Sequence, residues 1–164
     1  MNKKFLFWFS TIFICFAFQI LSSSALSIFG VFPNFLILST IFFALYYGPL
    51  RGTILGFIWG LFADSSSICI FGSQTFMLTL IGYVSGRFQR KIDEEKPIAQ
   101  MGLVLLMSIF YVWGLIFFES LFTNSSERLR SEISFIQPVY STVMSPLFFW
   151  LLMRWKSLFH FHEY

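Results

Sequence analysis

Residues 47–64 read YGPLRGTILGFIWGLFAD, an apolar segment with a small or acidic residue at every fourth position: Gly52, Gly56, Gly60 and Asp64. Residues four apart lie along one ridge of an α-helix, so the segment predicts a helix with a ridge that lacks side chains. The backbone of a second helix can approach such a ridge closely, and this spacing of small residues is typical of helix packing in lipid. The ridge therefore predicts close helix packing inside a membrane.

The composition of the whole chain indicates a membrane protein. Hydrophobic residues make up 57% of the 164 residues and charged residues only 12%, and the mean hydropathy is +0.75. Soluble globular domains carry about 25% charged residues, so this chain has too little polar surface for a water-soluble fold. A membrane-spanning helix takes about 20 residues, so a chain of this length is used up by about six or seven such helices with short loops. Residues 1–164 are therefore expected to form a single membrane domain.

Helix-breaking residues divide the chain into six apolar segments. Pro33-Asn34 opens the second segment, Gly48-Pro49 ends it, and Gly72 precedes the fourth. Proline suits the first turn of a helix, where its missing N–H costs no hydrogen bond. The second segment is so short that some local thinning of the bilayer or fraying of the helix is expected. Six transmembrane helices are therefore predicted, at residues 5–25, 33–47, 52–70, 73–87, 98–121 and 136–153.

The distribution of basic residues predicts the orientation. The first segment has the basic start of a signal peptide, but its length favours an uncleaved helix. With the N-terminus inside, the outer segments hold only Arg128 and Arg130, and the cytoplasmic segments hold the other nine basic residues. Cytoplasmic loops are enriched in such residues, so we expect both termini in the cytoplasm and a multi-pass protein of the cytoplasmic membrane. The nine are Lys3, Lys4, Arg51, Arg87, Arg90, Lys91, Lys96, Arg154 and Lys156.

Asp64 is an acid in a segment expected to lie in hydrocarbon. It follows Arg51 by thirteen residues, about 20 Å along a helix, which places it in the outer leaflet. An isolated acid there costs about 2.5–3.5 kcal/mol, so it needs a partner. Two interpretations are open: a proton or cation site, or a carboxylate that accepts backbone or hydroxyl hydrogen bonds where its helix breaks at residues 65–67. Because no other acid, His or Lys lies at similar depth, the capping interpretation is favoured.

A second pair of small residues, Gly82 and Gly86, lies in the fourth segment. The glycines of both segments either pack the bundle internally or leave a groove for the helix of a partner, and internal packing is favoured. In the sixth segment Pro146 frees the carbonyl of Thr142, so a kink is expected there. The hydroxyls of Ser141, Thr142 and Ser145 are close enough in sequence to satisfy the freed carbonyl.

Catalytic, metal and cofactor sites cannot be assembled from these residues. The two histidines, His160 and His162, lie in the C-terminal tail, and no intramembrane Ser–His pair, acid dyad or HExxH motif occurs. The charged segment 87–96 and Glu119 are expected to be solvated, with partner contacts as the alternative. No basic run resembles a nucleic-acid site. We therefore expect no enzyme activity, no cofactor and no nucleic-acid partner.

The order and spacing of these residues resemble the MreD family of bacterial rod shape-determining membrane proteins. The resemblance covers most of the chain and is strongest over residues 33–87, although Asn34 stands where Asp is expected at least as often. The residues that carry it are Pro33-Asn34, Tyr47-Gly48-Pro49, Arg51-Gly52, Gly56, Gly60, Asp64, Gly72, Gly82-Tyr83 and Gly86-Arg87.

The resemblance implies a non-enzymatic subunit of the cell-elongation complex. Family members bind MreC, a bitopic protein, and through it the actin-like MreB and the wall synthases, RodA and its transpeptidase; a homodimer within the complex could also form. The family is similar in fold to the six-helix substrate-binding subunits of energy-coupling-factor transporters. A small-molecule-binding transporter subunit is therefore the alternative function, and its polar candidates are Gln19, Asp64, Thr75, Thr79 and Glu119.

Overall fold

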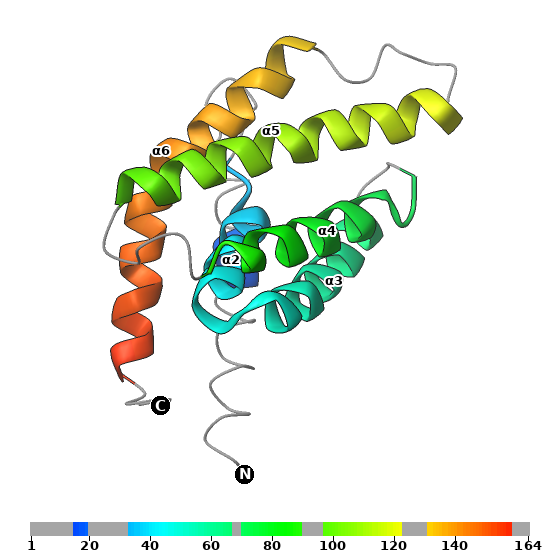
Figure 1. The fold of residues 1–164 in the computed structure, drawn as a ribbon. Coiled ribbons are helices and arrows are strands. Elements are labelled where there is room, and N and C mark those ends of the chain that lie inside the picture. The colour runs from blue at the N-terminus through cyan, green and yellow to red at the C-terminus, as the bar shows by residue number, and fades with distance from the viewer. Residues whose placement is uncertain (1–14, 20–32, 67–69, 90–96, 123–130, 159–164) are drawn as a thin grey trace.

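The computed structural model describes residues 15–19, 33–66, 70–89, 97–122 and 131–158. Within them the predicted all-α architecture is confirmed, and no strand occurs (Figure 1). Residues 15–19 are helical, but most of the expected first helix, residues 5–25, lies outside the described residues. The helices are α2 (Phe35–Tyr47), α3 (Pro49–Ser66), α4 (Ser73–Arg87), α5 (Pro97–Phe122) and α6 (Ser131–Leu158).

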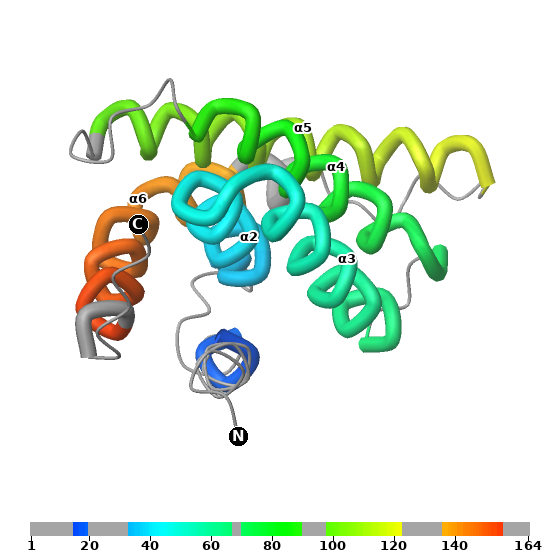
Figure 2. The backbone as a smooth tube through the Cα atoms, turned by 60° about the horizontal axis from the view of Figure 1, so that its bottom comes forward, coloured from blue at the N-terminus to red at the C-terminus, as the bar shows by residue number. Residues whose placement is uncertain are grey.

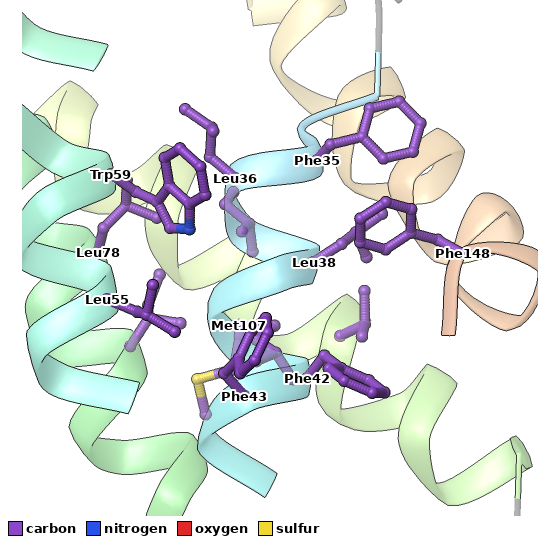
Figure 3. Close-up of a cluster of buried hydrophobic side chains, with 14 of the residues drawn as sticks. Phe35, Leu36, Leu38, Phe42, Phe43, Leu55, Trp59, Leu78, Met107 and Phe148 are labelled. Carbon is purple, nitrogen blue, oxygen red and sulfur yellow. The ribbon is translucent and has the colours of Figure 1, made fainter. Parts of the chain in front are cut away.

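Helix α2 forms the centre of the structure. Every residue from Phe35 to Leu45 is buried, and α3, α4, α5 and α6 all contact this helix. Figure 2 shows α3 and α4 on one flank of α2 and α6 on the other. Figure 3 shows side chains of α3, α4, α5 and α6, including Trp59, Leu78, Met107 and Phe148, around those of α2. Protein therefore covers the 13 residues of α2, and the expected thinning or fraying stays a prediction.

The N-terminus of α2 is capped by side chains from three parts of the chain. Asn34 Oδ1 accepts hydrogen bonds from the N–H groups of Leu36 (3.1 Å) and Ile37 (3.3 Å). The Phe35 N–H donates to Gln19 Oε1 (2.9 Å), and the Asn34 N–H donates to Ser141 Oγ of α6 (3.1 Å). These bonds satisfy N–H groups that a buried helix start would otherwise leave unpaired.

Gly48 alone breaks the chain between α2 and α3. Its φ of 92° is in the region that side chains disfavour, and its N–H donates to the Ala44 carbonyl (3.1 Å). Helix α3 begins directly afterwards at Pro49, three residues before the expected start at Gly52. Proline needs no partner for its nitrogen at a first helical position, so the helix can start there.

Helices α5 and α6 contain the two described segments that are long and apolar enough to cross a membrane, Ile98–Phe122 and Ile136–Trp155. Helix α6 itself begins at Ser131, so it is longer than its expected apolar part. Two prolines, Pro138 and Pro146, lie inside it, and Figure 1 shows that α6 changes direction along its length.

A hydroxyl group satisfies the carbonyl that Pro146 frees. The Ser145 Oγ–H, one of the three hydroxyls that the sequence places near this carbonyl, donates to the carbonyl oxygen of Thr142 (2.8 Å). The Thr142 Oγ1–H in turn donates to the Pro138 carbonyl (2.8 Å). Side-chain bonds of this kind let a proline remain in a helix without an unpaired backbone group.

Large apolar side chains cover the outside of α3, α4, α5 and α6. Monomeric soluble proteins rarely expose apolar patches larger than a few hundred Å², so this surface suits lipid rather than water. Among the most exposed are Leu50, Ile54, Phe57, Phe76, Leu106, Trp113, Phe117, Leu121, Val143, Leu147 and Trp150.

Candidate functional site: the α3–α4 helix pair

The glycine ridge of α3 faces the backbone of α4. A Cβ atom added to Gly56 would lie 2.3 Å from the carbonyl oxygen of Leu78, and one added to Gly60 would lie 2.2 Å from the Cα of Thr75. At Gly52 it would lie 2.5 Å from the Cβ of Ala44 in α2. Real Cβ atoms essentially never come so close to backbone atoms, so these contacts require glycine.

Helix α4 presents its own glycines to α3. A Cβ atom on Gly82 would lie 2.2 Å from the carbonyl oxygen of Gly52, and one on Gly86 would lie 2.3 Å from the Cα of Pro49. Positions 52 and 56 of α3 thus meet positions 82 and 78 of α4, so the two helices run antiparallel, side by side as in Figures 1 and 2. The two backbones touch along this whole face.

These contacts bear on the two interpretations of the glycines. Gly52, Gly56, Gly60, Gly82 and Gly86 are all buried, and the atoms that they meet belong to α2, α3 or α4. This is the geometry of packing within the bundle. The α3–α4 face is filled, so it leaves no groove in which the helix of another protein could lie.

Asp64 caps the N-terminus of α4. Its Oδ1 accepts the Gln74 N–H (3.1 Å) and its Oδ2 accepts the Thr75 N–H (2.9 Å), and the Thr75 hydroxyl also donates to Oδ2. The N-cap position of α4 is Gly72, which has no side chain to supply such bonds. Asp64 is only 3% exposed, and its negative charge lies at the positive end of the α4 dipole.

Asp64 also caps a helix that the sequence does not indicate. The expectation placed its partners at the break of its own helix, residues 65–67. The hydroxyls of Ser65 and Ser66 donate to the Phe62 carbonyl (2.8 and 3.0 Å), and Ser67 lies outside the described residues. Asp64 also reaches across to α4. The contact with α4 has a physical reason: the Gly52–Gly60 ridge brings α4 so close that its N-terminal N–H groups lie beside Asp64.

A polar connection continues from Asp64 into α5. Gln74, whose N–H bonds to Asp64, also accepts a hydrogen bond from the Tyr111 hydroxyl at its Oε1 (3.1 Å). The Thr79 hydroxyl donates to the Thr75 carbonyl (2.6 Å). Sequence reasoning missed Gln74 and Tyr111. One signal was available: a glycine N-cap at Gly72 leaves the next N–H groups in need of an acceptor.

The remaining sequence-predicted residues lie elsewhere. Gly72 has φ 97° and no atom near its missing Cβ, so it is needed for its backbone conformation rather than for space. Pro33, Asn34, Gly48 and Pro49 lie at helix ends, and Pro146 lies inside α6. Glu119 is partly exposed on α5. Three expected features lie outside the described residues: His160, His162 and the segment 90–96. Within the described residues, no cluster of three His, Cys, Asp or Glu side chains could hold a metal.

Comparison with known proteins gives one match. The family model of the rod shape-determining protein MreD matches residues 1–155, which includes both helices of the pair and all of the glycines discussed above. No curated protein and no solved structure matches the chain.

Proposed function

The chain belongs to the MreD family of rod shape-determining membrane proteins, and we propose that it is a non-catalytic subunit of the bacterial cell-elongation machinery. The family match over residues 1–155 is the observation that carries this proposal. In this role the chain binds an MreC-like bitopic protein in the membrane. Through that partner it links the cytoskeletal MreB to peptidoglycan synthesis by RodA and its transpeptidase.

The proposed location is the cytoplasmic membrane, with six helices crossing it and both termini inside. The apolar surfaces of α3 to α6 support insertion into lipid, and the nine-to-two distribution of basic residues supports the orientation. The likeness to the energy-coupling-factor subunits stays a prediction from the family resemblance.

The geometry favours a rigid scaffold. Backbone contact between α3 and α4 allows little sliding, since any shift would bring carbonyls and Cα atoms into collision. The Asp64 carboxylate holds the start of α4 in the same register. A partner helix therefore docks on an exposed helix face rather than between α3 and α4. Photocrosslinkers placed one at a time on the outer faces of α3, α5 and α6 would locate it.

The proposed function is tested in cells and in extracts. Depletion of the protein should turn rods into spheres, and the full-length chain should restore the rod shape. An MreC-like protein should copurify with the tagged chain from solubilised membranes. Cells that keep their shape after depletion, or a purified complex that lacks any such bitopic protein, would contradict the proposal.

The transporter alternative has weaker support. Such a subunit needs several polar groups directed at one ligand. Of the five candidates, Asp64 and Thr75 bond to each other, Thr79 bonds to Thr75, and Gln19 bonds to Phe35. These groups are engaged in holding helix ends. A vitamin-type ligand that raises the melting temperature of the purified protein would favour the alternative, because binding to the folded state stabilises it.

A further inference from the structure

Three arginines from three different helices lie at the same end of the structure. Gly86 of α4 packs on Pro49 of α3, so the neighbouring Arg87 and Arg51 lie at the same level. The Tyr46 hydroxyl at the end of α2 hydrogen-bonds to Met153 Sδ (3.7 Å), which brings Arg154 of α6 to this end as well. We call Arg51, Arg87 and Arg154 the arginine end.

Each of these arginines lies over an aromatic ring. The guanidinium carbons of Arg51, Arg87 and Arg154 lie 5.4, 5.1 and 5.8 Å from the ring centroids of Tyr47, Tyr83 and Trp150, respectively. The Arg87 guanidinium also donates a hydrogen bond to the Tyr83 hydroxyl. All three arginines are exposed. Stacking fixes the plane of a guanidinium at the surface, and its five N–H donors can bind oxygen atoms of more than one group.

Exposed apolar side chains border the arginine end directly. Leu50 is 74% exposed beside Arg51, Phe88 is 37% exposed beside Arg87, and Met153 is 37% exposed beside Arg154. The arginine end thus combines positive charge with an apolar border.

We propose that the arginine end binds the headgroups of anionic phospholipids. The guanidinium groups contact the lipid phosphates, and the acyl chains lie along Leu50, Phe88 and the apolar helix faces beyond them. A free phosphate or an acidic protein would use the charge but would leave the apolar border uncovered, so a lipid fits both features. This inference rests on the proposed insertion into a membrane and is independent of the proposed MreC-like partner.

Native mass spectrometry of the purified full-length chain tests this proposal. Micelles containing equal amounts of phosphatidylglycerol and phosphatidylcholine supply the two lipids in competition. We expect the wild-type chain to retain phosphatidylglycerol preferentially, and we expect this preference to weaken at high salt. Each of Arg51→Gln, Arg87→Gln and Arg154→Gln should lower it about fivefold, since a basic residue near a membrane surface contributes about this factor.

Further variants separate the proposal from its alternatives. The double variant Arg128→Gln/Arg130→Gln removes two positive charges from another part of the chain and should leave the preference unchanged. Lysine at positions 51, 87 and 154 should keep most of it. Equal binding of the two lipids by the wild type, or equal losses in the two sets of glutamine variants, would overturn the proposal. So would glutamine variants that retain lipid but lose an acidic protein on copurification. Absence of an MreC-like protein from the complex purified with the wild-type chain, with the lipid preference intact, would contradict only the proposed function.

Discussion

At the scale of single residues, position decides what a glycine contributes. Gly56 and Gly60 lie against the backbone of α4, whereas Gly102 of α5 has no atom within 4 Å of its missing Cβ. Gly48 and Gly72 instead supply a positive φ. The same residue type therefore provides close packing in one place and a chain reversal in another. Gly102 has neither role among the described residues.

Alanine at Gly56 or Gly60 should destabilise the protein strongly. The added methyl group meets backbone atoms that cannot move aside, so we expect the free energy of unfolding to fall by about 1–3 kcal/mol or more. The matched control is Gly102→Ala, which should raise it by up to about 1 kcal/mol because alanine favours a helix. Unfolding in detergent, followed by intrinsic fluorescence, measures both. Equal stability of Gly56→Ala and Gly102→Ala would show that α3 and α4 are not in backbone contact.

Removal of the Asp64 carboxylate should loosen the start of α4. Asp64→Ala leaves the N–H groups of Gln74 and Thr75 without their acceptor, and we expect a loss of about 2–3 kcal/mol in the free energy of unfolding. Asp64→Asn keeps one acceptor oxygen and should lose about half as much. Glu119→Gln, the control, should change stability little. A stable Asp64→Ala protein that fails only in cells would favour a proton or cation site over the cap.

At the scale of the helices, side chains form hydrogen bonds that the backbone lacks next to proline and glycine. Helix α6 continues through Pro146 because the Ser145 hydroxyl donates a hydrogen bond to the Thr142 carbonyl. Helix α4 begins after Gly72, which has no side chain, because the Asp64 carboxylate of α3 accepts the Thr75 N–H. Each of these bonds joins a residue to a backbone group that proline or glycine has left unpaired. The bond at Ser145 lies within α6, whereas the bonds of Asp64 couple the stability of α4 to that of α3.

The hydrogen bond from Ser145 predicts that substitutions at positions 145 and 146 have coupled effects on the free energy of unfolding. Ser145→Ala should cost about 0.5–1 kcal/mol in the presence of Pro146, because the Thr142 carbonyl then lacks a donor. In a Pro146→Ala background the backbone N–H at position 146 can bond to that carbonyl, and Ser145→Ala should cost almost nothing. A double-mutant cycle on the purified protein measures this difference. Additive effects of the two substitutions would contradict the claim that Ser145 satisfies the carbonyl that Pro146 frees.

At the scale of the whole molecule, the buried α2 organises the other helices. Aromatic side chains of α2, such as Phe35 and Phe42, pack against Phe148 and Phe149 of α6, while Leu55 and Trp59 of α3 cover the other flank (Figure 3). The arginine end and the Asp64 cap lie at opposite ends of this arrangement. Such polarity is what a protein with a fixed orientation in a bilayer requires.

The orientation itself is testable by chemical labelling. A single cysteine at Asn124, in a variant whose native cysteines Cys15 and Cys69 are replaced, should react with a membrane-impermeant reagent added to intact cells, since the loop that follows α5 is expected outside. A cysteine at Gln89, next to the arginine end, should react only after the cells are opened. Labelling of position 124 only from the cytosol would invert the topology and the orientation proposed here.

The sequence by itself determined the local features. Asn34 caps α2 through N–H groups two and three residues ahead of it, Gly48 interrupts the chain, and Ser145 lies within one turn of the carbonyl that it satisfies. Each of these involves residues close in the chain, so spacing and residue type are sufficient to predict them. The α-helical architecture follows in the same way from apolar segments separated by Gly and Pro.

Only the tertiary structure decided which helices meet. The spacing of Gly52, Gly56 and Gly60 predicts a close neighbour but does not say that it is α4, and nothing local to Asp64 indicates Gln74 and Thr75 as its partners. The central place of α2 was equally hidden, because a helix that is apolar all round suits lipid and protein alike. Contacts between distant residues depend on the packing of the whole bundle, and periodicity along one helix carries no information about its partner.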